Sequence, residues 1–198
     1  MIADNLPILQ IIIPLLSAPL CVVLRQRQLV WCLALAVCWV SLACSIGLLV
    51  EVMNHGPIVY DVGGWPAPIG IVYEVDPLAA IVLLIVTTVA SLVMPFAPRI
   101  LETEVTKEKH YLFYAAFLLC MTGLLGMTIT GDIFNVFVFL EISSLSSYSL
   151  ISMGTRRSAL MASYRYLVMG TIGSTFLLIG IGLAYMMTGT LNMVDLSE

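Results

Sequence analysis

Long apolar runs separated by short polar stretches organise this chain. Six segments reach the ~20 apolar residues that an α-helix needs to cross ~30 Å of hydrocarbon. They cover Leu6–Leu24, Leu29–Val50, Leu78–Ala97, Tyr111–Thr130, Ile133–Met153 and Tyr164–Met187. This pattern predicts an all-α integral membrane protein of about six transmembrane helices, in a single membrane domain over residues 1–198.

A second pattern falls between the second and third apolar segments, in the stretch NHGPIVYDVGGWPAPIGIVYEVD. Gly63, Gly64 and Pro66 are turn residues, and the flanking IVY triplets are β-branched and aromatic. Such runs on both sides of a glycine-containing turn are typical of a β-hairpin. We therefore expect a short external hairpin between helices two and three.

Composition supports the membrane assignment. Hydrophobic residues make up 61% of the chain and charged residues only 10%, against about 25% charged residues in soluble proteins. The bilayer is thus the expected surrounding, and no nucleic-acid partner is expected. The five cysteines form no CxxC pair and lie in apolar runs, so we expect neither a metal nor a cofactor. No motif predicts enzymatic chemistry by this polypeptide alone.

The basic residues predict the orientation. They follow the first, third and fifth apolar segments or open the sixth: Arg25, Arg27, Arg99, Lys107, Lys109, Arg156, Arg157 and Arg165. Because Lys and Arg concentrate in cytoplasmic loops, that side is assigned to the cytoplasm. We therefore expect a multi-pass protein of a bacterial-type inner membrane, with both termini on the external side.

Glu141 interrupts a segment that otherwise carries no charge, Ile133–Met153. A charged side chain at mid-membrane costs about 2.5–3.5 kcal/mol on insertion scales, and such residues commonly belong to proton relays or ion pathways. Burial raises the pKa of a carboxyl and a nearby cation lowers it, so a residue between both influences can load and release a proton. The competing interpretation is a glutamate that only bonds to a neighbouring helix.

Helical spacing extends this candidate site. Ser144 and Tyr148 fall on the same stripe as Glu141, where their hydroxyls can organise water. The opposite surface is assigned to Phe137, Val138 and Leu150.

Two further charged residues have open roles. Arg165 lies near the start of the sixth helix, where it is either an electrostatic partner of Glu141 or an arginine that extends to the interface. Asp132 begins the fifth helix, and its preferred role is an N-cap.

Three stretches carry a resemblance to a known family: GWPAPIGIVYEVDPLAA, TGDIFNVFVFLEISSLSSYSLISMG and YRYLVMGTIGSTFLLIGIGLAYMMTGTLNMVDL. They resemble the N-terminal part of the antiporter-like, proton-conducting subunits. That family is shared by respiratory complex I, membrane-bound hydrogenases and Mrp-type cation/proton antiporters, and these stretches are most similar to the D-type subunits of the Mrp antiporters.

The resemblance implies a function and a mechanism. Glu141 matches a family glutamate of a proton channel, and Arg165 falls where relatives often carry a basic residue. The family pairs that glutamate with a lysine on a following broken helix, which has no counterpart here. The leading hypothesis is a subunit of a multisubunit monovalent cation/proton antiporter, with protons and Na⁺ as candidate ions. The expected partners are other membrane subunits, including a chain that supplies the broken helix and its lysine.

Two alternatives stay open. One is a proton-translocating subunit of complex I, an NADH-quinone oxidoreductase, or of a membrane-bound hydrogenase; only in that case would the chain be part of an enzyme. The other is a structural remnant or a split-subunit scaffold.

Overall fold

The structure is a computed structural model that describes residues 5–65 and 70–197. Within these ranges, six helices are long and apolar enough to cross a membrane. In chain order the helices are α1 (Leu6–Leu24), α2 (Arg27–His55), α3 (Pro77–Val93), α4 (Ala97–Glu104), α5 (His110–Ile129), α6 (Ile133–Ser152), α7 (Arg157–Thr188) and α8 (Met193–Ser197). The expected all-α transmembrane architecture is confirmed.

Helix bounds match the apolar runs closely at some ends and not at others. Helix α1 spans the expected residues, whereas α2 and α7 extend beyond theirs, α7 beginning at Arg157 rather than Tyr164. Polar residues can continue a helix into the headgroup layer, since the backbone hydrogen bonds of the first turns do not depend on side-chain polarity. The apolar run therefore gives the minimum length of such a helix.

The third transmembrane segment is broken near its end by prolines. Helix α3 begins at Pro77, after the Asp76 carboxylate accepts a hydrogen bond from the Ala79 amide at 2.6 Å. It ends at Val93, and a 3₁₀ turn at Met94–Phe96 leads into α4. Pro95 lacks an amide donor, which accounts for the change from α-helical to tighter geometry.

The expected hairpin is present. Strands β1 (Ile58–Asp61) and β2 (Val72–Val75) pair antiparallel, with Ile58 opposite Val75. Gly63 and Gly64 take positive φ values of 70° and 75°, a conformation that glycine adopts without a steric cost. Pro66, the third expected turn residue, lies outside the described residues.

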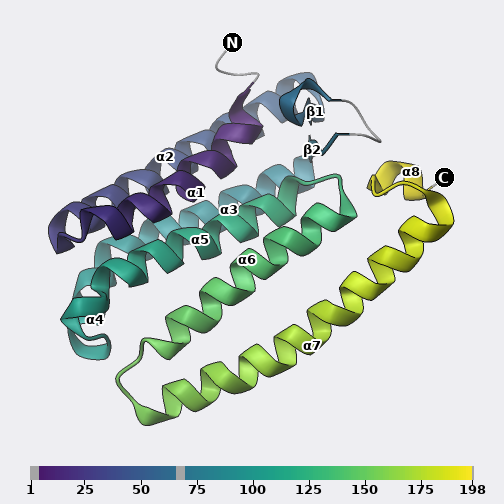
Figure 1. Ribbon diagram of the computed structural model, residues 1–198. Coiled ribbons are helices and arrows are strands. Elements are labelled where there is room, and N and C mark those ends of the chain that lie inside the picture. The colour runs from purple at the N-terminus through teal and green to yellow at the C-terminus, as the bar shows by residue number, and fades with distance from the viewer. Residues whose placement is uncertain (1–4, 66–69, 198) are drawn as a thin grey trace.

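The helices form a bundle in which α7 lies at one edge (Figure 1). The buried core is built mainly from α1, α2, α3 and α5, with Phe139 contributed by α6 and further residues by β2 and α4. Helix α6 packs on α5, and α7 packs on α6. In α7 the buried residues among those described are Ser163, Ser174 and Ile181, so most of its surface is exposed.

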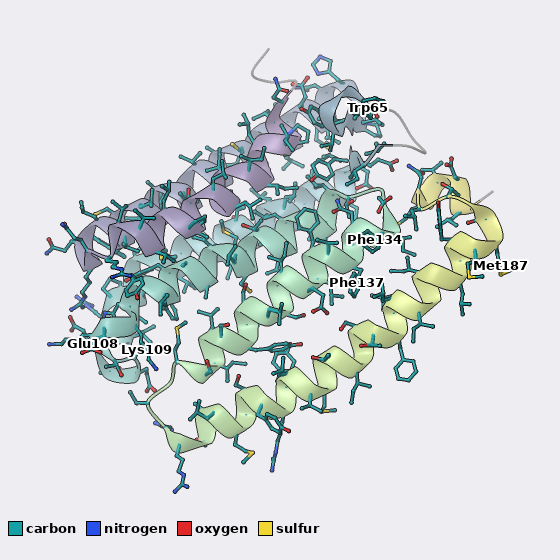
Figure 2. All side chains as sticks on the ribbon, in the orientation of Figure 1. Trp65, Glu108, Lys109, Phe134, Phe137 and Met187 are labelled. Carbon is teal, nitrogen blue, oxygen red and sulfur yellow. The ribbon has the colours of Figure 1, made fainter. Side chains whose placement is uncertain are left out.

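The two ends of the bundle differ in chemistry. The hairpin and α8 lie at one end, whereas α4 lies at the other (Figure 1). Figure 2 shows Glu108 and Lys109 beside α4. We call the α4 end the basic end, because it also carries Arg27 and Arg99.

Candidate functional site

Glu141 lies near the middle of α6, a helix of 20 residues. Its side chain is half-buried, and it forms no hydrogen bond or ion pair with any residue in the described part of the chain. The competing interpretation required a bond from Glu141 to a neighbouring helix, and these residues do not supply one. The carboxyl can therefore interact with water or with groups outside these residues.

Tyr148 shows which way this side of α6 faces. Its ring meets Tyr166 of α7 edge-on, with centroids 4.8 Å apart, and Ser163 of α7 donates a hydrogen bond to its carbonyl at 2.8 Å. Glu141 precedes Tyr148 by seven residues, which is two helical turns. Both residues therefore lie on the stripe of α6 that faces α7.

We call this contact face the α6–α7 seam, defined by Glu141, Ser144 and Tyr148 of α6 and by Ser163 and Gly170 of α7. Ser144 is half-buried between the other two α6 positions. The structure thus places the three expected α6 residues on one side of one helix, as helical spacing predicts.

Tyr148 closes the seam towards the basic end. Its side chain is 7% exposed. A methyl group at Gly170 would clash with the Tyr148 hydroxyl, so the phenol lies directly against the α7 backbone. Any route from the basic end to Glu141 along this seam must pass this side chain.

Phe137 lies on the Glu141 side of α6, so the prediction that places it on the opposite surface is wrong. It precedes Glu141 by four residues, which places it on the same side of α6. It packs near Phe134, with ring centroids 6.1 Å apart, and Figure 2 shows both rings on the α7 side of α6. Leu150 does lie on the other side, where it lines an apolar cavity between α3 and α5.

Arg165 is not brought together with Glu141. It is exposed and forms no ion pair with any residue that the structure describes. Its position is 200° around α7 from Ser163, the residue that bonds to α6. The guanidinium therefore belongs to the outer face of α7, away from the seam.

A polar cavity of about 500 Å³ opens at the hairpin end of the seam. It is lined by Asp132 and Phe134 at the start of α6, by Tyr185 near the end of α7, and by neighbouring loop residues. Phe134 and Phe137 lie between this cavity and Glu141 along α6. Glu141 is thus flanked by an aromatic pair on one side and by Tyr148 on the other.

Asp132 caps α6, as expected. Its carboxylate accepts a hydrogen bond from the Asn135 amide at 2.7 Å. The Asn135 side chain in turn donates to the Thr130 hydroxyl at 3.0 Å. On the adjoining strand β2, burial raises the pKa of the Tyr73 phenol, and a hydrogen bond with Asn135 partly offsets this. These bonds hold the start of α6 against the hairpin.

The side of α6 that faces α5 carries a polar cluster that lies outside the predicted stripe of Glu141, Ser144 and Tyr148. The Cys120 sulfur of α5 lies 3.4 Å from the Ser147 hydroxyl and 3.7 Å from that of Ser143. A Cβ atom at Gly123 would clash with Ser143 and the Phe139 carbonyl, so the two helices approach closely. The serine-rich stretch SSLSSYS indicates this cluster in the sequence, because its serines fall on more than one side of the helix.

Among the described residues, no group of three or more His, Cys, Asp or Glu side chains is arranged to hold a metal ion. The chemistry available at the seam is therefore that of a carboxyl, hydroxyls and a phenol. These groups can carry and relay protons.

Comparison with known proteins gives concordant results. A family model described as NADH dehydrogenase I, subunit N related protein, matches residues 45–198. The chain is 45% identical to NADH-quinone oxidoreductase subunit N of Desulforudis audaxviator, over 98% of its own length and 39% of that protein. It is 33% identical to the D-type subunit of an Na⁺/H⁺ antiporter of Alkalihalophilus pseudofirmus, again over 98% of its length and 39% of that protein.

Two solved structures of membrane complexes contain chains that are similar to this one in fold and sequence. A chain of the membrane-bound sulfane sulfur reductase, an archaeal respiratory membrane complex, matches with a TM-score of 0.90 and 35% identity, over 97% of this chain and 39% of that one. A chain of the Mrp complex from Dietzia sp. matches with a TM-score of 0.85 and 30% identity, over 97% and 36%. The present chain spans 39% of the length of the two curated relatives described above. The family model covers most of the chain, which therefore belongs to the family of NADH dehydrogenase I subunit N-related proteins.

Proposed function

We propose that this chain is a membrane subunit of a multisubunit monovalent cation/proton antiporter and contributes the glutamate half of a proton pathway. The observation that carries the proposal is the Glu141 carboxyl, which is half-buried at mid-helix on the seam and has no partner among the described residues. The similarity to the D-type subunit of an Na⁺/H⁺ antiporter and to a chain of an Mrp complex supports the choice of complex.

Each seam residue has a role in this proposal. Glu141 takes up and releases the proton. Ser144, one turn away, orders water beside the carboxyl. Tyr148 lies against α7 between Glu141 and the basic end, where it restricts access from that side. Arg165 lies outside the seam, so it acts on Glu141 only through intervening water or through a segment that covers the outer face of α7.

The cation that pairs with Glu141 comes from another segment in this proposal. Helix α7 exposes most of its surface, and a further membrane helix packed there would approach the seam. The family resemblance assigns a lysine to such a helix. The partners are accordingly other membrane subunits, one of which supplies that lysine, and the transported ions are protons and Na⁺.

The proposed location is a bacterial-type inner membrane. The basic end faces the cytoplasm in this orientation, because Lys and Arg concentrate on that side. The hairpin and both termini then lie on the external side, where the cavity beside Asp132 opens.

The proposal is tested by Glu141→Ala in inverted membrane vesicles that contain the assembled complex. We expect cation-dependent proton flux to be abolished, with the amount of assembled complex unchanged. The control is Ser149→Ala, since the Ser149 side chain is exposed and its hydroxyl donates only to the Leu145 carbonyl of its own helix. Retained flux in the Glu141→Ala complex would rule out the assigned role.

A second candidate function is a proton-translocating subunit of a redox complex. The 45% identity to an NADH-quinone oxidoreductase subunit N and the likeness to a respiratory membrane complex favour it. Co-purification separates the two functions. Flavin and iron–sulfur partners would identify the redox complex, whereas small hydrophobic subunits alone would identify the antiporter. A scaffold without transport function would predict that Glu141→Gln has no effect on flux in either complex.

A further inference from the structure

A separate cavity of about 440 Å³ opens at the basic end of the bundle, and no seam residue lines it. It lies between the first turns of α2, the junction of α3 with α4, and the start of α5 (Figure 1). The side chains that matter for its chemistry are Arg27, Trp31, Arg99, Glu102 and Tyr114.

The walls of this cavity are held in place by interactions within the chain. The Arg27 guanidinium pairs with the Glu102 carboxylate at 2.5 Å, which ties α2 to α4. The Trp31 indole donates a hydrogen bond to the Met94 carbonyl at 3.3 Å, which ties α2 to the end of α3. The proline-containing break between α3 and α4 directs the face with Arg99 and Glu102 towards this space.

Two polar side chains on the cavity walls form no hydrogen bond or ion pair among the described residues. Arg99 forms no hydrogen bond or ion pair with any residue in the described ranges. Tyr114 is only 1% exposed, and its hydroxyl has no hydrogen-bond partner within those ranges. The phenol lines the cavity, so its hydroxyl can donate a hydrogen bond to a group bound there. Two guanidinium groups face a single carboxylate here, so the cavity favours an anion.

We propose that this cavity binds the phosphate of an anionic phospholipid. Arg99 and the Tyr114 hydroxyl donate hydrogen bonds to the phosphate oxygens, and Arg27 offsets the charge of Glu102. Trp31 and the prolines offer apolar surface to the glycerol and the upper acyl chains. The position supports a lipid source, because basic cavities between helices at the membrane surface suit anionic headgroups and tryptophan is enriched at that level.

The test measures lipid binding to the purified complex by native mass spectrometry in neutral detergent. Phosphatidylglycerol and phosphatidylcholine are titrated separately, and inorganic phosphate is added as a competitor in a third arm. We expect phosphatidylglycerol to bind more tightly than phosphatidylcholine. Arg99→Gln is expected to weaken phosphatidylglycerol binding roughly tenfold, equivalent to about 1.4 kcal/mol.

Two further variants separate this site from general surface charge. Tyr114→Phe removes only the hydroxyl and is expected to weaken phosphatidylglycerol binding without reducing assembly. Arg157→Gln removes an exposed arginine from the same end of the molecule that does not line the cavity, and it is expected to leave binding unchanged. Equal losses of phosphatidylglycerol affinity in Arg99→Gln and Arg157→Gln would overturn the proposed binding site. Displacement of phosphatidylglycerol by millimolar inorganic phosphate would show that the cavity binds free phosphate and not a phospholipid.

Discussion

At the scale of single residues, Glu141 stands out because no described side chain offsets the free-energy cost of placing its charge inside the bundle. An isolated carboxylate at mid-membrane is destabilising by several kcal/mol, and the described chain offers Glu141 no donor. Protonation of a carboxyl removes its charge and with it this cost, whereas a cation brought near by another segment would stabilise the charged form. Switching between these two forms is the step that a proton carrier requires.

Gly170 is the residue-scale feature that can be tested against a matched control. Gly170→Ala places a methyl group on the Tyr148 hydroxyl, and we expect a loss of about 1–3 kcal/mol from overpacking. Gly173→Ala in the same helix meets no atom within 4 Å and gains helix propensity. Thermal denaturation in detergent should therefore show a lower midpoint for the first variant and an unchanged or higher one for the second. Equal midpoints would contradict the close contact.

The N-cap of α6 gives a second residue-scale prediction. Asp132→Ala removes the acceptor for the Asn135 amide and is expected to cost about 0.5–2 kcal/mol of stability. Asp132→Asn keeps an acceptor oxygen and should retain most of that stability. If both variants are as stable as the parent protein but neither supports transport, capping is not the main role of Asp132.

At the scale of elements, a buried polar network joins α1, α2 and α3. The Gln10 side chain donates to the Ser45 hydroxyl at 2.7 Å, and the Thr87 hydroxyl donates to the same oxygen at 3.1 Å. All three side chains are fully buried. Bonds of this kind join helices where hydrocarbon offers no competing partner. The network therefore fixes the mutual register of the three helices on the far side of α5 from the seam.

Ser45→Ala tests this network. The substitution leaves the buried Gln10 amide without its acceptor, which costs about 1–3 kcal/mol. We expect a lower denaturation midpoint, and no change in the Ser149→Ala control. Adding Gln10→Leu to Ser45→Ala should recover part of the loss, since removing both partners is nearly neutral. A strictly additive double variant would show that the two side chains are not coupled.

At the scale of the whole molecule, chemistry is divided between the two ends of the bundle. The hairpin end carries the cavity beside Asp132, whereas the basic end carries the cavity beside Arg99. The seam connects these ends along one edge of the bundle (Figure 1). A proton carried by Glu141 would thus move between two chemically different surfaces, and the phospholipid site belongs to only one of them.

The orientation of these ends is tested by labelling with a membrane-impermeant maleimide. His55→Cys lies at the end of α2 beside the hairpin, and Lys109→Cys lies at the basic end. We expect His55→Cys to react in intact cells and Lys109→Cys to react only after permeabilisation. The parent protein with its own five cysteines provides the background. The reversed pattern would show that the basic end faces outward.

Much of this architecture could be predicted from the sequence because membrane helices must satisfy their own backbone. Long apolar runs therefore gave the six spans, and Gly63 and Gly64 marked the hairpin turn. The direction of Arg165 could not be predicted, because it depends on which face of α7 meets α6. The Gln10–Ser45–Thr87 network was likewise invisible, since each residue is a single polar position in an apolar run and only packing brings the three together.

The central claim is that Glu141 exchanges a proton during transport, and Glu141→Gln tests it most directly. Glutamine has nearly the same shape but cannot lose a proton at any working pH. In proteoliposomes that contain the whole complex, the account predicts that cation-driven proton flux, followed with a pH-sensitive dye, falls to the level of empty liposomes in Glu141→Gln. Assembly and the flux of Ser149→Ala should be unchanged. Wild-type flux through an assembled Glu141→Gln complex would contradict the account.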